Sequence, residues 1–217
     1  ALPPGTTTGQ VVALFVKPRT RRRRCRFVEL PEMRGRVGKP RAFVSHTWNA
    51  PFADLVAAIR HALRDDEFVW IDIFAVRQWA GNGADLAFEC VIREAPCLLL
   101  VGRHVPAVAA LSRQDAIAKR VPAEAKQWCA FYRVWCLVEL SAALLFGKTA
   151  VMLIGDSDGE GRFVPNLGMI ANLMHSIDVR QAGASVEPDR VRILQTIEGG
   201  VGFDALNRQA VGALVGA

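Results

Sequence analysis

The chain reads Trp135-Cys136-Leu137-Val138-Glu139-Leu140 within a segment, residues 134–147, in which Glu139 is the only charged residue. At 100° per residue, Glu139 falls on the same helical stripe as Trp135 and other apolar side chains, so it has no polar face to point into. An ionised carboxylate without a partner is costly to remove from water, so the pattern indicates a carboxyl group that lines a cleft. The structural alternative is that Glu139 caps a neighbouring segment or pairs with a buried arginine.

On both sides of this segment, short apolar runs rich in β-branched residues alternate with helical patterns. This alternation is typical of parallel strands joined by crossover helices, and it predicts the α/β class. We expect strands at residues 41–45, 68–73, 97–101 and 149–154, and helices at residues 51–63, 85–93, 131–146, 169–177, 188–197 and 203–215.

The positive charge of the chain is localised. Of the formal net charge of +6, all comes from six arginines between Arg19 and Arg26, because the remaining 21 basic residues balance 21 acidic ones. Clustered arginines can bind phosphate groups, but Phe27 is the only aromatic residue beside them. We therefore expect a solvated segment and do not expect nucleic acid as a partner.

Cysteine usage and hydropathy indicate a cytoplasmic protein. The five cysteines form no CxxC pair and the four histidines show no ligand spacing, so neither a disulfide framework nor a metal site is expected. No charged segment precedes the apolar residues 11–16, and Glu139 and Lys148 interrupt the longest apolar run. We therefore expect no signal peptide and no membrane span.

Polar and aromatic residues gather where the predicted strands end, which is the edge where open parallel sheets bind ligands. They are Ser45, His46, Thr47 and Trp48 after the first strand, and Asp72, Phe74, Arg77, Gln78 and Trp79 at and after the second. Aromatic rings stack on bases and guanidinium groups pair with phosphates, so the set suits a ligand that has both. Each residue also has a structural interpretation: the tryptophans as packing residues, His46 as a hydrogen-bonded residue and Asp72 as a partner of loop amides.

The order of these segments resembles the TIR (Toll/interleukin-1 receptor) domain family. Phe43-Val44-Ser45-His46 resembles the opening strand and first loop, and Val69-Trp70-Ile71-Asp72 resembles the second strand, which leads into the family's BB loop. Residues 97–101 are similar to the third strand. The most specific match is the Trp135 to Leu140 stretch, which is similar to the Trp-Cys-x-x-Glu-Leu motif on the helix of the catalytic glutamate in members that hydrolyse NAD.

The resemblance covers about residues 41–156 and implies a flavodoxin-like, three-layer sandwich with a central parallel sheet. It leaves residues 1–40 as an N-terminal extension with the arginine-rich segment. Residues 157–217 are left as a C-terminal helical appendage, which we expect to pack on the core because it has too few apolar residues for a core of its own. The BB loop, residues 74–86, carries no recognisable family pattern.

The activity implied by the resemblance is cleavage of the nicotinamide–ribose bond of NAD+, with NAD+ as substrate and no further cofactor. One carboxyl group suffices, because nicotinamide leaves as a neutral ring from a cationic linkage. Glu139 would be the catalytic residue and Trp135 would wall the pocket, and the surrounding apolar residues should raise the pKa of Glu139. The substrate-binding residues implied are Ser45, His46, Thr47, Trp48, Asp72, Phe74, Arg77, Trp79 and Trp135.

The resemblance also implies a role in immune or cell-death signalling, with activation by self-association. The alternative is a non-enzymatic TIR-like module that assembles through the BB loop and a neighbouring helix, to which Trp79, Phe88 and the C-terminal helices would contribute contacts.

Overall fold

The computed structural model describes residues 2–215 and confirms the α/β class. Its five strands form one sheet in the order β2-β1-β3-β4-β5. Strands β1 to β4 are parallel, and β5 runs antiparallel to β4. The strands are β1 (Ala42–Ser45), β2 (Val69–Trp70), β3 (Cys97–Arg103), β4 (Thr149–Ser157) and β5 (Phe163–Pro165).

The antiparallel β5 is an addition to the four predicted strands of the central parallel sheet. Strand β4 continues to Ser157, beyond the predicted end at residue 154, and a tight turn then reverses the chain. An antiparallel neighbour needs only such a turn, whereas a parallel one needs a crossover helix. Gly155 allows the pairing, because a Cβ atom at this position would overlap the carbonyl oxygen of Val164.

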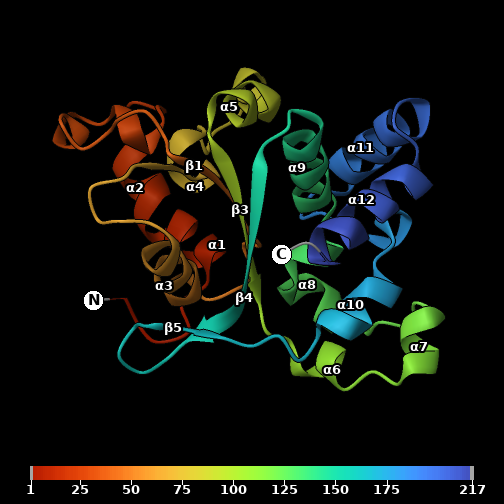
Figure 1. Ribbon diagram of the computed structural model, residues 1–217. Helices are drawn as coiled ribbons and strands as arrows, with labels where there is room; N and C mark the ends of the chain where they lie inside the picture. The colour runs from red at the N-terminus through yellow and green to blue at the C-terminus, as the bar shows by residue number, and fades with distance from the viewer. Residues whose placement is uncertain (1, 216–217) are drawn as a thin grey trace.

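Helices cover both faces of the sheet (Figure 1). One face is covered by the helical run α1 (Thr8–Val11), η1 (Val12–Val16) and α2 (Lys17–Thr20), together with α3 (Phe52–Ala62). The other face is covered by α9 (Val134–Leu145), and α11 (Glu187–Gly199) and α12 (Phe203–Val215) pack against α9 on the side away from the sheet. Strand β3 alternates between the two layers: Leu98 and Leu100 belong to the core under α9, whereas Leu99 and Val101 belong to the core under α1 and α3. This is the period of two that a strand buried on both faces requires.

Shorter helices connect these layers. They are η2 (Phe27–Glu29), η3 (Pro31–Met33), α4 (Asp72–Ala75), η4 (Gly83–Leu86), α5 (Phe88–Glu94), α6 (Pro106–Ala109), α7 (Arg113–Ile117), α8 (Ala123–Trp128), η5 (Ala130–Tyr132), α10 (Ile170–Ser176) and η6 (Val179–Gln181). The predicted second strand is shorter than expected, because Asp72 already begins α4 and its Oδ1 accepts a hydrogen bond from the Ile73 amide at 2.7 Å. The helix predicted at residues 131–146 divides into η5 and α9, and the one at 85–93 divides into η4 and α5.

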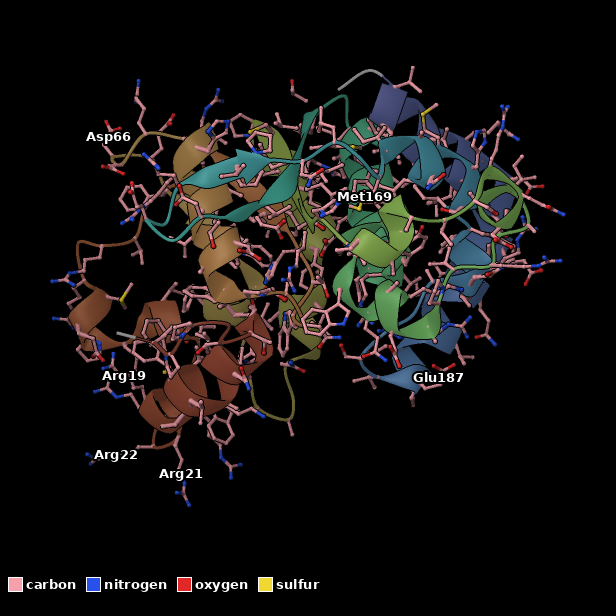
Figure 2. The ribbon with its side chains drawn as sticks, turned by 90° about the horizontal axis from the view of Figure 1, so that it is seen from below. Arg19, Arg21, Arg22, Asp66, Met169 and Glu187 are labelled. Carbon is pink, nitrogen blue, oxygen red and sulfur yellow. The ribbon has the colours of Figure 1, made fainter. Side chains whose placement is uncertain are left out.

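The N-terminal residues form part of the sandwich. Thr7 caps the helical run with a capping box shared with Gln10, and Val11, Val12 and Val16 are buried beneath it. The arginine-rich segment follows directly, and Arg19, Arg21 and Arg22 extend from the edge of the molecule (Figure 2). The described part of the extension therefore shields one face of the sheet while presenting its charges to solvent.

The C-terminal helices share the core beneath α9. Leu173 of α10, Ile193 of α11 and Leu206 of α12 lie in the same apolar cluster as Leu137 and Leu140. A short backbone ladder joins the two parts, since the Val134 amide donates to the Gly183 carbonyl at 3.0 Å. Among residues 2–215, no helix combines the length and the apolar character needed to cross a membrane.

Candidate active site

A cavity of about 410 Å³ opens at the carboxyl end of β1 and runs along the first turns of α9. Its volume lies in the range typical of small-molecule sites. The residues predicted from the sequence that line it are His46, Thr47, Trp48, Asp72, Gln78, Trp135 and Glu139. Ser45 reaches it through Glu139: the Ser45 hydroxyl donates a 2.5 Å hydrogen bond to Oε2 of the carboxyl group. The edge of the sheet and the helix of Glu139 therefore meet at one place.

Glu139 lies within the cavity wall with only 8% of its surface exposed. Among the described residues, no basic side chain forms an ion pair with it, so the alternative of a buried arginine partner is wrong. Burial raises the pKa of Glu139 to about 8; the Ser45 hydrogen bond opposes this rise and the nearby Asp72 charge adds to it. In the free protein at neutral pH, the side chain is therefore mostly the neutral acid.

His46 is the second buried polar group of the cavity. Its side chain is 4% exposed, and Nε2 lies 3.9 Å from Oδ1 of Asp72, which is too long for a hydrogen bond. Burial lowers the pKa of His46, against the opposing effects of Asp72 and of a hydrogen bond to the Val44 backbone. The ring is thus neutral at pH 7, and Nε2 has no partner within the described chain.

Asp72 is held in a fixed orientation at the mouth of the first loop. Its Oδ2 accepts a 2.8 Å hydrogen bond from Nε1 of Trp48, and its Oδ1 accepts one from the Ile73 amide. The Asp72 carboxyl group therefore keeps the Trp48 ring at the cavity.

Aromatic rings form one wall. The rings of Trp135 and Phe88 lie 5.4 Å apart between centroids, and Phe88 is in turn 5.4 Å from Trp70. Trp70 stacks on Phe43 of β1 with centroids 4.6 Å apart. Trp135 is thus the cavity end of a packed row of rings, which fixes the wall and limits the access of water to this side.

Three residues predicted to contact a substrate lie outside the cavity lining. Phe74 packs against Phe27, with ring centroids 5.3 Å apart. Arg77 pairs with Asp85 at 2.9 Å, and Nε1 of Trp79 donates to the Thr20 hydroxyl at 3.0 Å. All three side chains are engaged away from the cavity. For Phe74 and Trp79 the partner is the N-terminal segment, whose position no local pattern revealed.

Other lining residues were not among the predicted site residues. They are Val44, Val76, Asn82, Leu86, Phe88, Arg133, Cys136, Ser185, Val186 and Asp189. Ser185, Val186 and Asp189 come from the C-terminal appendage, which the Gly183 ladder brings to the start of α9. One feature of the sequence could have pointed to Arg133: it is the charged residue immediately before the apolar segment that contains Glu139.

No protein-family model matches the chain, and comparisons with curated proteins and with solved structures find no match either. Within residues 2–215, no group of three or more His, Cys, Asp or Glu side chains is placed to hold a metal ion.

Proposed function

We propose that the chain is a TIR-like NAD+ nucleosidase, which cleaves the nicotinamide–ribose bond and is activated by self-association in immune or cell-death signalling. The observation that carries the proposal is the buried carboxyl group of Glu139, which faces a cavity without a basic partner and is hydrogen-bonded by Ser45. The strand order β2-β1-β3-β4 supports it, because flavodoxin-like sheets share this order and bind ligands beside the first strand.

Charge explains why a group with a raised pKa suits this reaction. The nicotinamide linkage of NAD+ is cationic, and an opposite charge close to a carboxyl group favours its ionised form. Binding of NAD+ would therefore lower the pKa of Glu139 and release its proton. The carboxylate is then formed in a water-poor site, where it stabilises the oxocarbenium-like charge on the ribose most strongly.

The reaction balances without a second carboxyl group. The C1′–N bond breaks, its electron pair leaves on the nicotinamide nitrogen, and the ring departs as a neutral molecule. A water molecule adds to C1′ and loses a proton to solvent. In this scheme Ser45 orients Glu139, the free Nε2 of His46 offers a hydrogen bond to the ligand, and Trp135 with Phe88 packs against its apolar surface.

The test is nicotinamide release from NAD+ by the purified chain at high local concentration, with the protein crowded on a scaffold. We expect turnover by the wild type and a loss of at least about 100-fold in Glu139→Gln, because removing electrostatic stabilisation of a transition state commonly costs this much. Glu198→Gln, at an exposed position on α11, is the matched control and should retain full turnover. A clustered wild type without turnover would contradict the proposal.

A non-enzymatic TIR-like scaffold is the second candidate. Exposed apolar side chains favour it, among them Leu14 on η1 and Leu145 at the end of α9, which are 70% and 76% exposed. Self-association that survives Glu139→Gln and is lost in Leu145→Ser, without nicotinamide release by any variant, would support this candidate.

A further inference from the structure

Arg133 stands out among the charged residues of the cavity. It caps the N-terminus of α9, it is partly buried, and its Nη2 donates a 2.7 Å hydrogen bond to the Ser185 hydroxyl. No carboxylate among residues 2–215 forms an ion pair with it, whereas Arg77 and Arg103 both pair with aspartates. Desolvation lowers the pKa of Arg133, although an arginine remains protonated. A cation that is partly removed from water and faces a cavity is a position where an anion is stabilised.

The backbone beside Arg133 adds to the same field. The Val134 amide is used by Gly183, but the amides of Trp135 and Cys136 donate to no group within the described chain. Free amides in the first turn of a twelve-residue helix carry partial positive charge and favour anions. Trp135 and Cys136 line the same cavity as Arg133, so the start of α9 and the guanidinium group both belong to it.

The acidic residue nearest in sequence to Ser185 on this rim does not cancel the charge. Asp189 lines the cavity, but its Oδ1 is already paired with Nη2 of Arg192 at 3.2 Å. In the same cavity, His46 presents Nε2 without a partner, as described above. The cavity thus holds an unpartnered polar atom and an arginine that forms no ion pair among the described residues, which together point to a ligand that offers both a hydrogen-bonding group and an anionic group.

The spacing suits a nucleotide. Arg133 precedes Glu139 by six residues, which corresponds to roughly 9 Å along a helix axis. In a nucleotide, the 5′-phosphate is attached through C5′ to C4′, which lies across the ring oxygen from C1′ and on the same face of the ring as the base. A ribose whose C1′ lies beside Glu139 can therefore direct its phosphate toward Arg133.

We propose that Arg133, held in place by Ser185, binds the 5′-phosphate or diphosphate of the ligand, so that the site takes phosphorylated nucleotides in preference to nucleosides. That the ligand carries nicotinamide rests on the proposed function, whereas the binding of a phosphate group by Arg133 does not. The C-terminal appendage contributes to recognition through this contact, because Ser185 and the Gly183 ladder set the position of the guanidinium group.

The experiment measures binding by calorimetry, with three probes: inorganic pyrophosphate, nicotinamide mononucleotide and nicotinamide riboside. The full chain carrying Glu139→Gln is the background, so that no probe is consumed. We expect the mononucleotide to bind at least about 10-fold more tightly than the riboside, because hydrogen bonds between an arginine and a phosphate are charge-assisted and strong. Arg133→Gln should remove this difference and abolish pyrophosphate binding, while the affinity for the riboside stays unchanged.

Three further variants sharpen the result. Arg133→Lys keeps the charge without the planar fork and should retain part of the pyrophosphate affinity. Ser185→Ala should weaken pyrophosphate binding several-fold, and Arg208→Gln, at an exposed arginine of α12, should leave it unchanged. Should Arg133→Gln fail to fold, as judged by its melting transition, the Lys and Ala variants still test the site.

The outcomes separate the two proposals. Equal affinity for mononucleotide and riboside, or pyrophosphate binding that persists in a folded Arg133→Gln, would overturn the anion site. Arginine-dependent pyrophosphate binding by a chain that does not cleave NAD+ would uphold the anion site and contradict the nucleosidase function alone.

Discussion

The Ser45 hydroxyl donates a 2.5 Å hydrogen bond to Oε2 of Glu139, and so joins two residues that lie 94 positions apart in the chain. Ser45 ends β1 and is 1% exposed, and Glu139 sits one turn into α9 with 8% of its surface exposed. This bond ties the helix to the carboxyl edge of the sheet and holds a carboxyl group where solvation is poor.

The stability of the protein should fall as the pH rises toward 8. The folded-state pKa of Glu139 is raised from 4.5 to about 8, so its contribution is fully present below pH 4.5 and is lost as the pH rises through 8. The expected slope between about pH 6.5 and 8 is a loss of roughly 1.4 kcal/mol per pH unit. In Glu139→Gln this slope should be absent, so the variant becomes increasingly more stable than the wild type. Denaturant unfolding at several pH values measures the free energy of unfolding of the wild type and of Glu139→Gln. If this free energy changed with pH in the same way for both proteins, the pKa of Glu139 would not be raised.

His46 acts in a different pH window. Its folded-state pKa is lowered from 6.5, so the stability that it contributes is present above pH 6.5 and is lost as the pH falls below this value. The Glu139 measurement is therefore made above pH 6.5, and the comparison with Glu139→Gln isolates the glutamate.

Turnover of NAD+ should rise with pH. Since kcat/KM reports the groups of the free enzyme, it should increase up to about pH 8 and then level off, as Glu139 becomes ionised. Ser45→Ala removes a hydrogen bond that lowers the pKa of Glu139, so the profile should move to higher pH. Nicotinamide release between pH 6 and 9.5 provides the measurement. A rate that falls over this range would mean that the protonated acid is the active form.

Asp85 should be a major stabilising contact of the loop beside the cavity. Its enclosed carboxyl group accepts hydrogen bonds from Arg26 at 2.5 Å and from Arg77 at 2.9 Å, and these hold its pKa well below the usual range. We expect Asp85→Asn to cost roughly 1–3 kcal/mol, less than for a fully buried pair because both guanidinium groups are partly exposed. The wild type should have a higher free energy of unfolding than Asp85→Asn above pH 3.8, and this difference should disappear as the pH falls below that value. Urea unfolding of both proteins at pH 7 gives the value, and Asp65→Asn on an exposed loop is the control.

The exposed arginines should be dispensable for the reaction. Arg21, Arg22 and Arg23 are exposed and form no ion pair among the described residues, and changing residues 21–24 to Gln should leave NAD+ turnover unchanged. The same change should flatten any salt dependence of nucleic-acid retention, because fewer counterions are released. Retention on a polyanion column at rising salt, measured with turnover, checks both. Loss of turnover would place this segment in the function of the cavity.

The sequence predicted the α/β class and the gathering of Ser45 and Asp72 at the edge where the strands end, and the structure brings Glu139 to the same edge. The alternation of Leu98, Leu99 and Leu100 reflects which faces of a strand are buried, and parallel strands bring their carboxyl ends together, so these features follow from local pattern. The isolated charge of Glu139 indicated burial for the same local reason.

Only the tertiary structure decided which distant segments complete the site. The N-terminal helices engage Phe74 and Trp79, Asp85 takes Arg77, and the Gly183 ladder brings Ser185 to Arg133. The antiparallel β5 likewise depends on the close approach of Gly155 and Val164. The spacing of apolar residues along the sequence predicts which side chains are buried, but it does not predict which segment buries them, because the hydrophobic effect is non-directional. The partners of Arg133 and Trp79 are therefore fixed by long-range packing, which no stretch of sequence encodes by itself.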